Sequence, residues 1–257
     1  MPGRSGVHLW FGRQMRNALR IAVIIPALNE DRAIGQVISE IPTWVDQIIV
    51  ADNGSIDSTA EQARIAGAKV VLEPERGYGA ACLAAIKALE DVDVVVFVDG
   101  DLSDYPEDMA QLVDPIVLRE TDLVIASRAI GKREAGSLTL QQLFGNWLAT
   151  SLMRIVWGAR FTDLGPFRAI KHDALKKLNM RDRNYGWTVE MQVRATEEGL
   201  SYIEVPARYR RRIGQSKVSG TVKGTVMAGY KILSLIGRHA LRHWLKKIQG
   251  QNSANQT

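Results

Sequence analysis

Two aspartates separated by one glycine are the residues with the clearest chemical meaning in this sequence. Asp99 and Asp101 follow the apolar run VVVFV, so a predicted buried strand ends directly in an acidic cluster. Two carboxylates this close repel each other unless a cation lies between them. Mg²⁺ and Mn²⁺ prefer oxygen ligands, and Mg²⁺ is typically held by one or two carboxylates plus substrate phosphates. The pair therefore predicts a divalent-metal site that a phosphorylated ligand completes.

Three further polar clusters follow apolar runs nearer the N-terminus. They are PALNE at 26–30, DNGSID at 52–57 and RGYG at 76–79. Taken alone, the second is compatible with a helix cap and the third with a plain turn. Their occurrence at successive predicted strand ends favours a shared ligand site instead.

The elements that must position these clusters alternate between strands and helices. Apolar runs rich in valine and isoleucine alternate with amphipathic segments, the runs lying at 20–26, 46–52, 68–74, 93–99 and 122–128 and the segments at 30–40, 57–66, 77–89 and 106–120. This pattern predicts an α/β fold in one domain, with a mostly parallel sheet buried on both faces. In such sheets ligands bind beyond the carboxyl ends of the strands, which is where the polar clusters fall.

Composition and motifs argue against several other classes. Of the 257 residues 46% are hydrophobic and 24% charged, as in an ordinary globular chain, and no run approaches the roughly 18 apolar residues of a membrane-spanning helix. We do not expect a secretory signal, because the start lacks an apolar core. Neither a GxxxxGK[ST] loop nor a GxGxxG after the first strand is present. Cys82, the single cysteine, excludes an internal disulfide and is expected in the core.

The net charge of +5 is unevenly distributed. No acidic residue precedes Glu30, where four arginines lie, and none follows Glu204, after which come eleven lysines and arginines. This segregation suggests a polyanionic partner, such as phosphate groups or an anionic membrane surface. We do not expect nucleic acid as a partner, because no recognised nucleic-acid-binding motif accompanies the charge.

The motifs resemble those of inverting family 2 glycosyltransferases with the GT-A fold, and most closely those of dolichyl-phosphate mannose synthases and other polyprenyl-phosphate glycosyltransferases. VIIPALNE resembles the family's PxxNE, ADNGSIDST its VDDGSxDxT and VDGDLSDYPED its DADxQxxPE. The resemblance implies a nucleotide-sugar donor and Mg²⁺ or Mn²⁺. It implies donor contacts at Pro26, Asn29, Glu30, Asp52, Arg76, Gly77, Asp99 and Gly100, and a metal site at Asp99, Asp101 and Ser103, where Ser103 replaces the family's glutamine.

The acceptor side also carries a resemblance. TDLGPFRAIK resembles the family's DxxGxFR element, one residue shorter, and implies that Asp163 lies near a sugar. RYRRRIGQSKVSG resembles its RxxGxSK loop and, with Arg128, implies phosphate contacts by Arg211, Ser216 and Lys217. Dolichyl-phosphate mannose synthases carry a further arginine in the helix after Arg128; here Asn146 lies near that place, and Arg133 and Arg154 are candidate substitutes. A phosphate acceptor needs no general base, whereas a hydroxyl acceptor needs one, for which Asp163 and Glu190 are the candidates.

We expect a basic extension at 1–20, a glycosyltransferase domain at 21–220, an amphipathic helix at 221–248 and a polar tail at 249–257. The helix combines apolar and aromatic residues with lysine and arginine and has no acidic residue. This combination is typical of helices that lie in a membrane interface, although a helix that docks on a membrane protein or forms a homodimer has the same pattern.

The sequence therefore predicts an inverting, metal-dependent glycosyltransferase bound peripherally to the cytoplasmic face of a membrane. It would move a hexose from a nucleotide sugar of the GDP-mannose or UDP-glucose type to polyprenyl phosphate. One alternative is transfer to a hydroxyl group of a sugar, a glycerate or a lipid. The other is a non-catalytic protein that binds a nucleotide sugar and regulates a partner.

Overall fold

A mixed sheet of seven strands forms the centre of the computed structural model, which describes residues 16, 18–214 and 222–254. The strand order is β3-β2-β1-β4-β6-β5-β7. Only β6 runs antiparallel to its neighbours β4 and β5 among the described strands. The bounds are β1 Ile21–Ala27, β2 Gln47–Asp52, β3 Lys69–Leu72, β4 Val94–Phe97, β5 Leu123–Arg133, β6 Arg168–Lys171 and β7 Tyr202–Tyr209. The predicted α/β fold with a mostly parallel sheet is confirmed.

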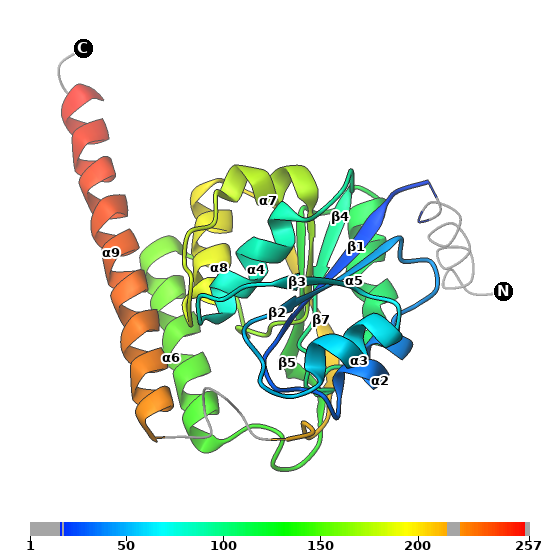
Figure 1. Cartoon of the computed structure of the whole chain (residues 1–257). Helices are drawn as coiled ribbons and strands as arrows, with labels where there is room; N and C mark the ends of the chain where they lie inside the picture. The colour runs from blue at the N-terminus through cyan, green and yellow to red at the C-terminus, as the bar shows by residue number, and fades with distance from the viewer. Residues whose placement is uncertain (1–15, 17, 215–221, 255–257) are drawn as a thin grey trace, which may run out of the picture.

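Helices cover both faces of this sheet (Figure 1). In chain order they are α2 Ile34–Ser39, α3 Thr59–Ile65, α4 Tyr78–Lys87, the 3-10 helix η1 Pro106–Met109, α5 Ala110–Val117, α6 Leu140–Trp157, α7 His172–Leu178, α8 Trp187–Glu197 and α9 Val222–Ala254. One apolar core joins the sheet to α2, α3 and α5. A second core joins the other face to α4, α6, α7, α8 and α9, and it contains the buried Cys82. Burial on both faces explains why the central strands read as continuous apolar runs.

The parallel half of the sheet aligns the ends of the strands that carry the polar clusters. β1 pairs with β2 on one side and with β4 on the other, with Ala27 opposite Asp52 and Ile24 opposite Phe97. The residues that follow these strands therefore meet at one edge of the sheet. This alignment depends only on the register of three buried strands.

The long helices α6 and α9 lie side by side at one end of the molecule (Figure 1), where the rings of Trp157 and His243 are 6.1 Å apart. Thr139 begins α6 with a capping box that it forms with Gln142, and Gly158 ends the helix in a left-handed conformation at φ 69°. α9 continues past the predicted end at residue 248 to Ala254. None of the described helices is both long and apolar enough to cross a membrane.

Candidate active site

A cavity of about 860 Å³ lies beyond the carboxyl ends of β1 and β4, where the sequence predicts a ligand site. Side chains from β1, from the segment after β3, from β5 and from the loop before β6 meet there. The predicted site residues in its wall are Pro26, Glu30, Arg76, Gly77, Asp99, Gly100, Asp101, Arg128 and Asp163. Residues far apart in the sequence thus share one concave surface large enough for a small ligand.

The aspartate pair sits on the short segment that follows β4. Asp101 is buried, and its Oδ1 accepts hydrogen bonds from the backbone N–H of Ser103 at 3.0 Å and from the Ser103 hydroxyl at 2.6 Å. Asp99 Oδ1 accepts a hydrogen bond from the Tyr78 hydroxyl at 3.0 Å. Ser103 is fully buried behind Asp101 and does not line the cavity. It orients the carboxylate from behind.

Negative charge accumulates around this pair. Burial, followed by the charge of Asp101, raises the pKa of Asp99 to about 6. Burial and the charges of Asp99 and Asp101 also raise the pKa of Asp104, whose buried Oδ2 has no hydrogen-bond partner among the described residues. A cation at this position would relieve the crowding.

The available oxygen atoms fit a hard divalent cation. The described residues contain no group of three or more His, Cys, Asp or Glu side chains that could hold a metal ion by themselves. Asp99 and Asp101 supply only part of a coordination shell, which is the usual situation for Mg²⁺ bound together with substrate phosphates. The donor set therefore fits an ion that binds together with a phosphorylated ligand.

Arg212 is the cation that the structure places against the pair. Its Nη1 lies 2.9 Å from Asp101 Oδ2, and it lines the cavity. Burial works against its charge, but the nearby Asp101 carboxylate raises the pKa of Arg212. The guanidinium is therefore charged and occupies one of the two oxygens that a metal would use.

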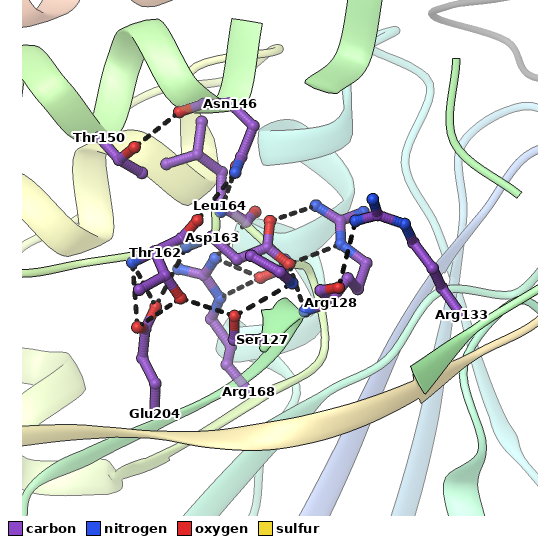
Figure 2. A network of polar contacts seen from close by, with 12 residues as sticks. Ser127, Arg128, Arg133, Asn146, Thr150, Thr162, Asp163, Leu164, Arg168 and Glu204 are labelled. Carbon is purple, nitrogen blue, oxygen red and sulfur yellow. Dashed lines mark hydrogen bonds and ion pairs between the residues drawn. The ribbon is translucent and has the colours of Figure 1, made fainter. Parts of the chain in front are cut away.

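Asp163 is tied to Arg128 in a buried network (Figure 2). Arg128 donates to Asp163 Oδ2 from Nε and from its backbone N–H, and to Oδ1 from Nη2, each at 2.7 Å. Burial opposes ionisation, but Arg128 holds the pKa of Asp163 below its usual value. Asn146 braces the same loop, because it donates to Thr162 O and accepts from the backbone N–H of Leu164. In this arrangement Asp163 is the counter-ion of Arg128, and both of its carboxylate oxygens accept hydrogen bonds from that residue, which makes it a weak base.

Glu190 lies outside the cavity wall. Its Oε2 accepts hydrogen bonds from the backbone N–H groups of Arg181 and Asp182 at 3.0 and 2.6 Å, and its Oε1 accepts from Arg194 Nε at 2.8 Å. The side chain is buried in the first turn of α8. It anchors the segment before the helix and does not line the cavity.

Asn29 and Asp52 support the site from behind the wall. Asn29 Oδ1 accepts from the backbone N–H of Ile56 at 2.9 Å, and Asp52 Oδ1 accepts from that of Ser55 at 3.2 Å. Both bonds hold the DNGSID turn in place. Neither residue lines the cavity, whereas the neighbouring Asn53 does.

Gly77 marks a close approach between two chain segments. A Cβ atom at this position would lie 2.0 Å from the carbonyl oxygen of Arg183, which no side chain tolerates. Its N–H donates to Asn53 Oδ1 at 2.7 Å. The glycine thus lets the segment after β3 reach the cavity between β2 and the 182–184 segment.

The predicted phosphate loop is only partly described. Arg211 is exposed and lies outside the cavity wall, with its Nε donating to the carbonyl oxygen of Ala135 at 2.8 Å. Ser216 and Lys217 lie outside the described residues. Arg133 lines both the main cavity and an adjoining cavity of about 410 Å³, and Arg154 lines the adjoining one.

The cavity wall formed by α6 and α9 is mostly apolar, with Gln141, Gln142 and Asn146 as its polar side chains. Leu143, Phe144 and Leu148 come from α6, and Ile232 and Leu233 come from α9. Neither helix contains an acidic residue. The same two helices carry most of the large hydrophobic side chains that are exposed in the described part of the chain, namely Leu140, Phe144, Trp147, Ile155, Val226, Met227, Tyr230, Leu233, Leu241, Trp244 and Leu245. We call this set the α6–α9 apolar surface.

Sequence reasoning did not find Tyr78, Tyr209 or Arg212, all of which line the cavity. Tyr78 follows directly on the predicted Arg76-Gly77 pair, so its place beside a site residue was a usable signal. Tyr209 and Arg212 lie in the run RYRRR, whose repeated charges hide which side chain faces inward.

Comparisons with known proteins agree with this geometry. The profile of Glycosyl transferase family 2 matches residues 22–179. An uncharacterized glycosyltransferase of Mycobacterium tuberculosis (strain ATCC 25618 / H37Rv) is 33% identical, over 81% of this chain and 94% of its own. A dolichyl-phosphate hexose transferase of Haloferax volcanii is 30% identical, over 86% of this chain and 96% of its own.

A similar fold occurs in a solved structure. The glucosyl-3-phosphoglycerate synthase of Mycobacterium tuberculosis, in complex with Mn²⁺, UDP and glucosyl-3-phosphoglycerate, superposes with a TM-score of 0.73 at 22% identity, over 89% of this chain and 82% of its own. The GT-A architecture expected from the motifs is thereby confirmed. The match to the family profile and the identity to the mycobacterial glycosyltransferase show that this chain belongs to glycosyl transferase family 2.

Proposed function

We propose that this glycosyltransferase moves a hexose from a nucleotide sugar to polyprenyl phosphate, with inversion at the anomeric carbon and with Mg²⁺ or Mn²⁺ as its metal. The observation that carries the proposal is that one cavity joins the Asp99–Asp101 pair to the apolar wall of α6 and α9. A nucleoside diphosphate with its metal suits the acidic end, and an isoprenoid chain suits the apolar wall. The dolichyl-phosphate hexose transferase relative supports the same acceptor class.

The wall residues divide between the two substrates. Pro26, Glu30, Arg76 and Gly77 would hold the nucleoside, and Asp99 would face the ribose or the donor sugar. Asp101, together with Asp99, would hold the metal, which when bound stabilises the negative charge that develops on the departing diphosphate. Arg128, Arg133 and, by resemblance, Lys217 would attract the acceptor phosphate.

The state of the carboxylates favours a phosphate acceptor. A phosphate is ionised at pH 7 and attacks the anomeric carbon without a general base, so catalysis consists of positioning and electrostatic stabilisation. Asp163 is held by Arg128, and Glu190 lies outside the cavity. Neither of the two predicted bases is therefore needed in the proposed reaction.

The second candidate is transfer to a hydroxyl group of a small phosphorylated acceptor. The observation that favours it is the similar fold of the glucosyl-3-phosphoglycerate synthase. Such an acceptor would leave the apolar wall without a ligand group to contact. It would also require a base, which Asp163 could supply only by leaving Arg128.

The α6–α9 apolar surface supports a place at a membrane surface. Basic residues flank it on α9, among them the exposed Arg238 and Arg242, and no acidic side chain lies on either helix to oppose anionic lipid. A lipid acceptor would reach the cavity directly from that surface. A membrane protein or a second copy of this chain is the competing occupant.

The deciding experiment measures release of nucleoside diphosphate from UDP- and GDP-sugars with Mg²⁺ or Mn²⁺. The experiment has three arms: the first contains no acceptor, the second contains polyprenyl phosphate and the third contains 3-phosphoglycerate. Asp101→Asn is the control in each arm. Release that requires polyprenyl phosphate and Asp101 supports the proposal and names the donor. Release that requires 3-phosphoglycerate supports the second candidate, and an absence of turnover with every donor contradicts both.

A further inference from the structure

Arg212 stands at the point where a metal ion would meet Asp101. Its Nη1 lies 2.9 Å from Asp101 Oδ2, while Ser103 takes the other carboxylate oxygen through its N–H and its hydroxyl. Both oxygens of Asp101 are therefore engaged within the protein. A divalent ion that binds this carboxylate must either share an oxygen with one of these two partners or displace it.

The backbone around Arg212 is fixed, and its side chain is the movable part. Arg210 N–H donates to Ser103 O, and Ile213 N–H donates to Asp101 O, both at 2.9 Å. Arg210 Nε also donates to Leu102 O. The segment is thus held against the aspartate loop on both sides of Arg212, so any displacement must occur through the rotamers of this one long side chain.

Electrostatics indicates which partner of Asp101 a bound metal ion would displace. A guanidinium and a divalent cation at the same carboxylate oxygen repel each other strongly in a partly buried site. Ser103 sits fully buried and bonds to Asp101 through its backbone as well, so Arg212 is the partner that gives way. Its guanidinium remains within the cavity that would receive the diphosphate, and a planar donor fork matches phosphate oxygens well.

We propose that Arg212 is an exchangeable counter-ion: it neutralises Asp101 until the metal binds, and it then turns to the diphosphate of the donor. The inference rests on the proposed function, because it requires a metal and a nucleoside diphosphate at this site. It makes two predictions of opposite sign. Removing the guanidinium strengthens binding of the metal alone, and it weakens binding of the nucleoside diphosphate to the metal-loaded protein.

The test compares wild type with Arg212→Met, Arg212→Lys and the matched control Arg208→Met. Arg208→Met removes the same charge from a position nearby in the sequence, whose guanidinium pairs with Glu107 and Asp108 and does not line the cavity. Mn²⁺ binding without nucleotide is followed by the loss of the free-ion electron paramagnetic resonance signal. Binding of UDP and of GDP at saturating Mn²⁺ is followed by calorimetry, and circular dichroism checks that each variant is folded.

For Arg212→Met we expect Mn²⁺ alone to bind about tenfold more tightly, as for loss of a like charge beside the site, and the nucleotide to bind about tenfold more weakly. Arg212→Lys keeps the charge and should give Mn²⁺ binding near that of wild type, and Arg208→Met should change neither affinity. A structural role for Arg212 would weaken both affinities, and no role would leave both unchanged. Either result overturns the inference.

Absence of the metal and nucleoside-diphosphate site, the part of the proposed function on which the inference rests, gives a different pattern. Wild type and Asp101→Asn would then bind Mn²⁺ and nucleotide equally, or neither would bind them. If wild type binds both and Asp101→Asn does not, while Arg212→Met matches wild type, only the exchange is refuted.

Discussion

Arg128 and Asp163 form a two-pronged ion pair in which Nε and Nη2 each donate to a carboxylate oxygen at 2.7 Å. The side chains are 13% and 2% exposed, so the pair is almost fully removed from water. It joins the middle of β5 to the loop before β6, in the cavity wall. The pair therefore holds together two segments that line the cavity.

We predict that Asp163→Ala destabilises the fold by about 3–5 kcal/mol, because it leaves the Arg128 charge buried without a partner. Urea denaturation at pH 7 measures the loss. Asp91→Asn is the control, since its pair with Arg20 is exposed on both sides and such pairs contribute about 0–1 kcal/mol. Equal losses in the two variants would contradict the structural role of the Arg128–Asp163 pair.

The same pair predicts a dependence of stability on pH. Burial opposes ionisation of Asp163, but Arg128 keeps its folded pKa below the ordinary value of 3.8. A carboxyl group whose folded pKa is lowered contributes stability above its unfolded pKa and loses it as the pH falls through the folded pKa. The stability difference between wild type and Asp163→Asn should thus be constant from pH 7 to about pH 5 and should shrink below pH 4. A difference that grows on acidification would contradict the assignment.

Much of the donor side could be predicted from the sequence, because its signals are local. Apolar runs locate β1, β2 and β4, and the polar clusters that follow them must meet where parallel strands end together. Asp99, Asp101 and Glu30 therefore reach one cavity, as the sequence suggests. Asn29 follows β1 and Asp52 ends β2, but both side chains bond to the turn after β2 and neither lines the cavity, which the strand pattern does not predict.

The acceptor side was harder to predict because its geometry depends on long-range contacts. Ala207 and Tyr209 are buried at alternate positions of β7, and a continued alternation would bring Arg211 inward. The chain instead leaves the sheet after Tyr209 and bonds to the 101–103 segment, which turns Arg212 inward. Likewise, nothing near Asp163 or Glu190 in the sequence shows that Arg128 and the 181–182 backbone hold them.

The hydrogen bond from the Tyr78 hydroxyl should lower the pKa of Asp99 and so affect metal binding. Burial and then Asp101 raise the pKa of Asp99 to about 6, while Arg212 and the Tyr78 hydroxyl lower it. Tyr78→Phe removes that hydroxyl, so the pKa of Asp99 rises further. Cation binding needs the ionised carboxylate, so binding is lost as the pH falls through this pKa, and the loss should begin at a higher pH in the variant. Mn²⁺-dependent UDP binding between pH 5 and pH 8 measures the shift.

The control for this shift is Tyr202→Phe, which removes a hydroxyl that accepts from the backbone N–H of Arg160 and does not line the cavity. Its pH midpoint should equal that of wild type. Identical midpoints in all three proteins would show that the Tyr78 hydroxyl does not act on Asp99.

The α6–α9 apolar surface gives the last prediction, which concerns membrane binding. Trp147 and Trp244 are 61% and 58% exposed on the two helices, and neither exposure is typical of a large apolar side chain on a monomer surface. Replacing both by serine should lower binding to vesicles of phosphatidylglycerol and phosphatidylcholine at least about tenfold, since each large apolar side chain contributes about 1.5–3 kcal/mol when buried. Raising the salt concentration should weaken the binding of wild type as well, because the basic residues of α9 are screened.

Ile65→Ser is the matched control, because Ile65 is 72% exposed on α3, which packs in the core on the other face of the sheet. It should leave vesicle binding unchanged. Sedimentation with vesicles and light scattering without them distinguish the two possible occupants of the surface. If the surface binds lipid, the double tryptophan variant alone no longer sediments with vesicles. If the surface pairs two copies of the chain, the variant has a lower mass than wild type by light scattering in the absence of vesicles. Vesicle binding that survives the double substitution would place the membrane contact elsewhere on the chain and would remove the direct path from the bilayer to the apolar cavity wall.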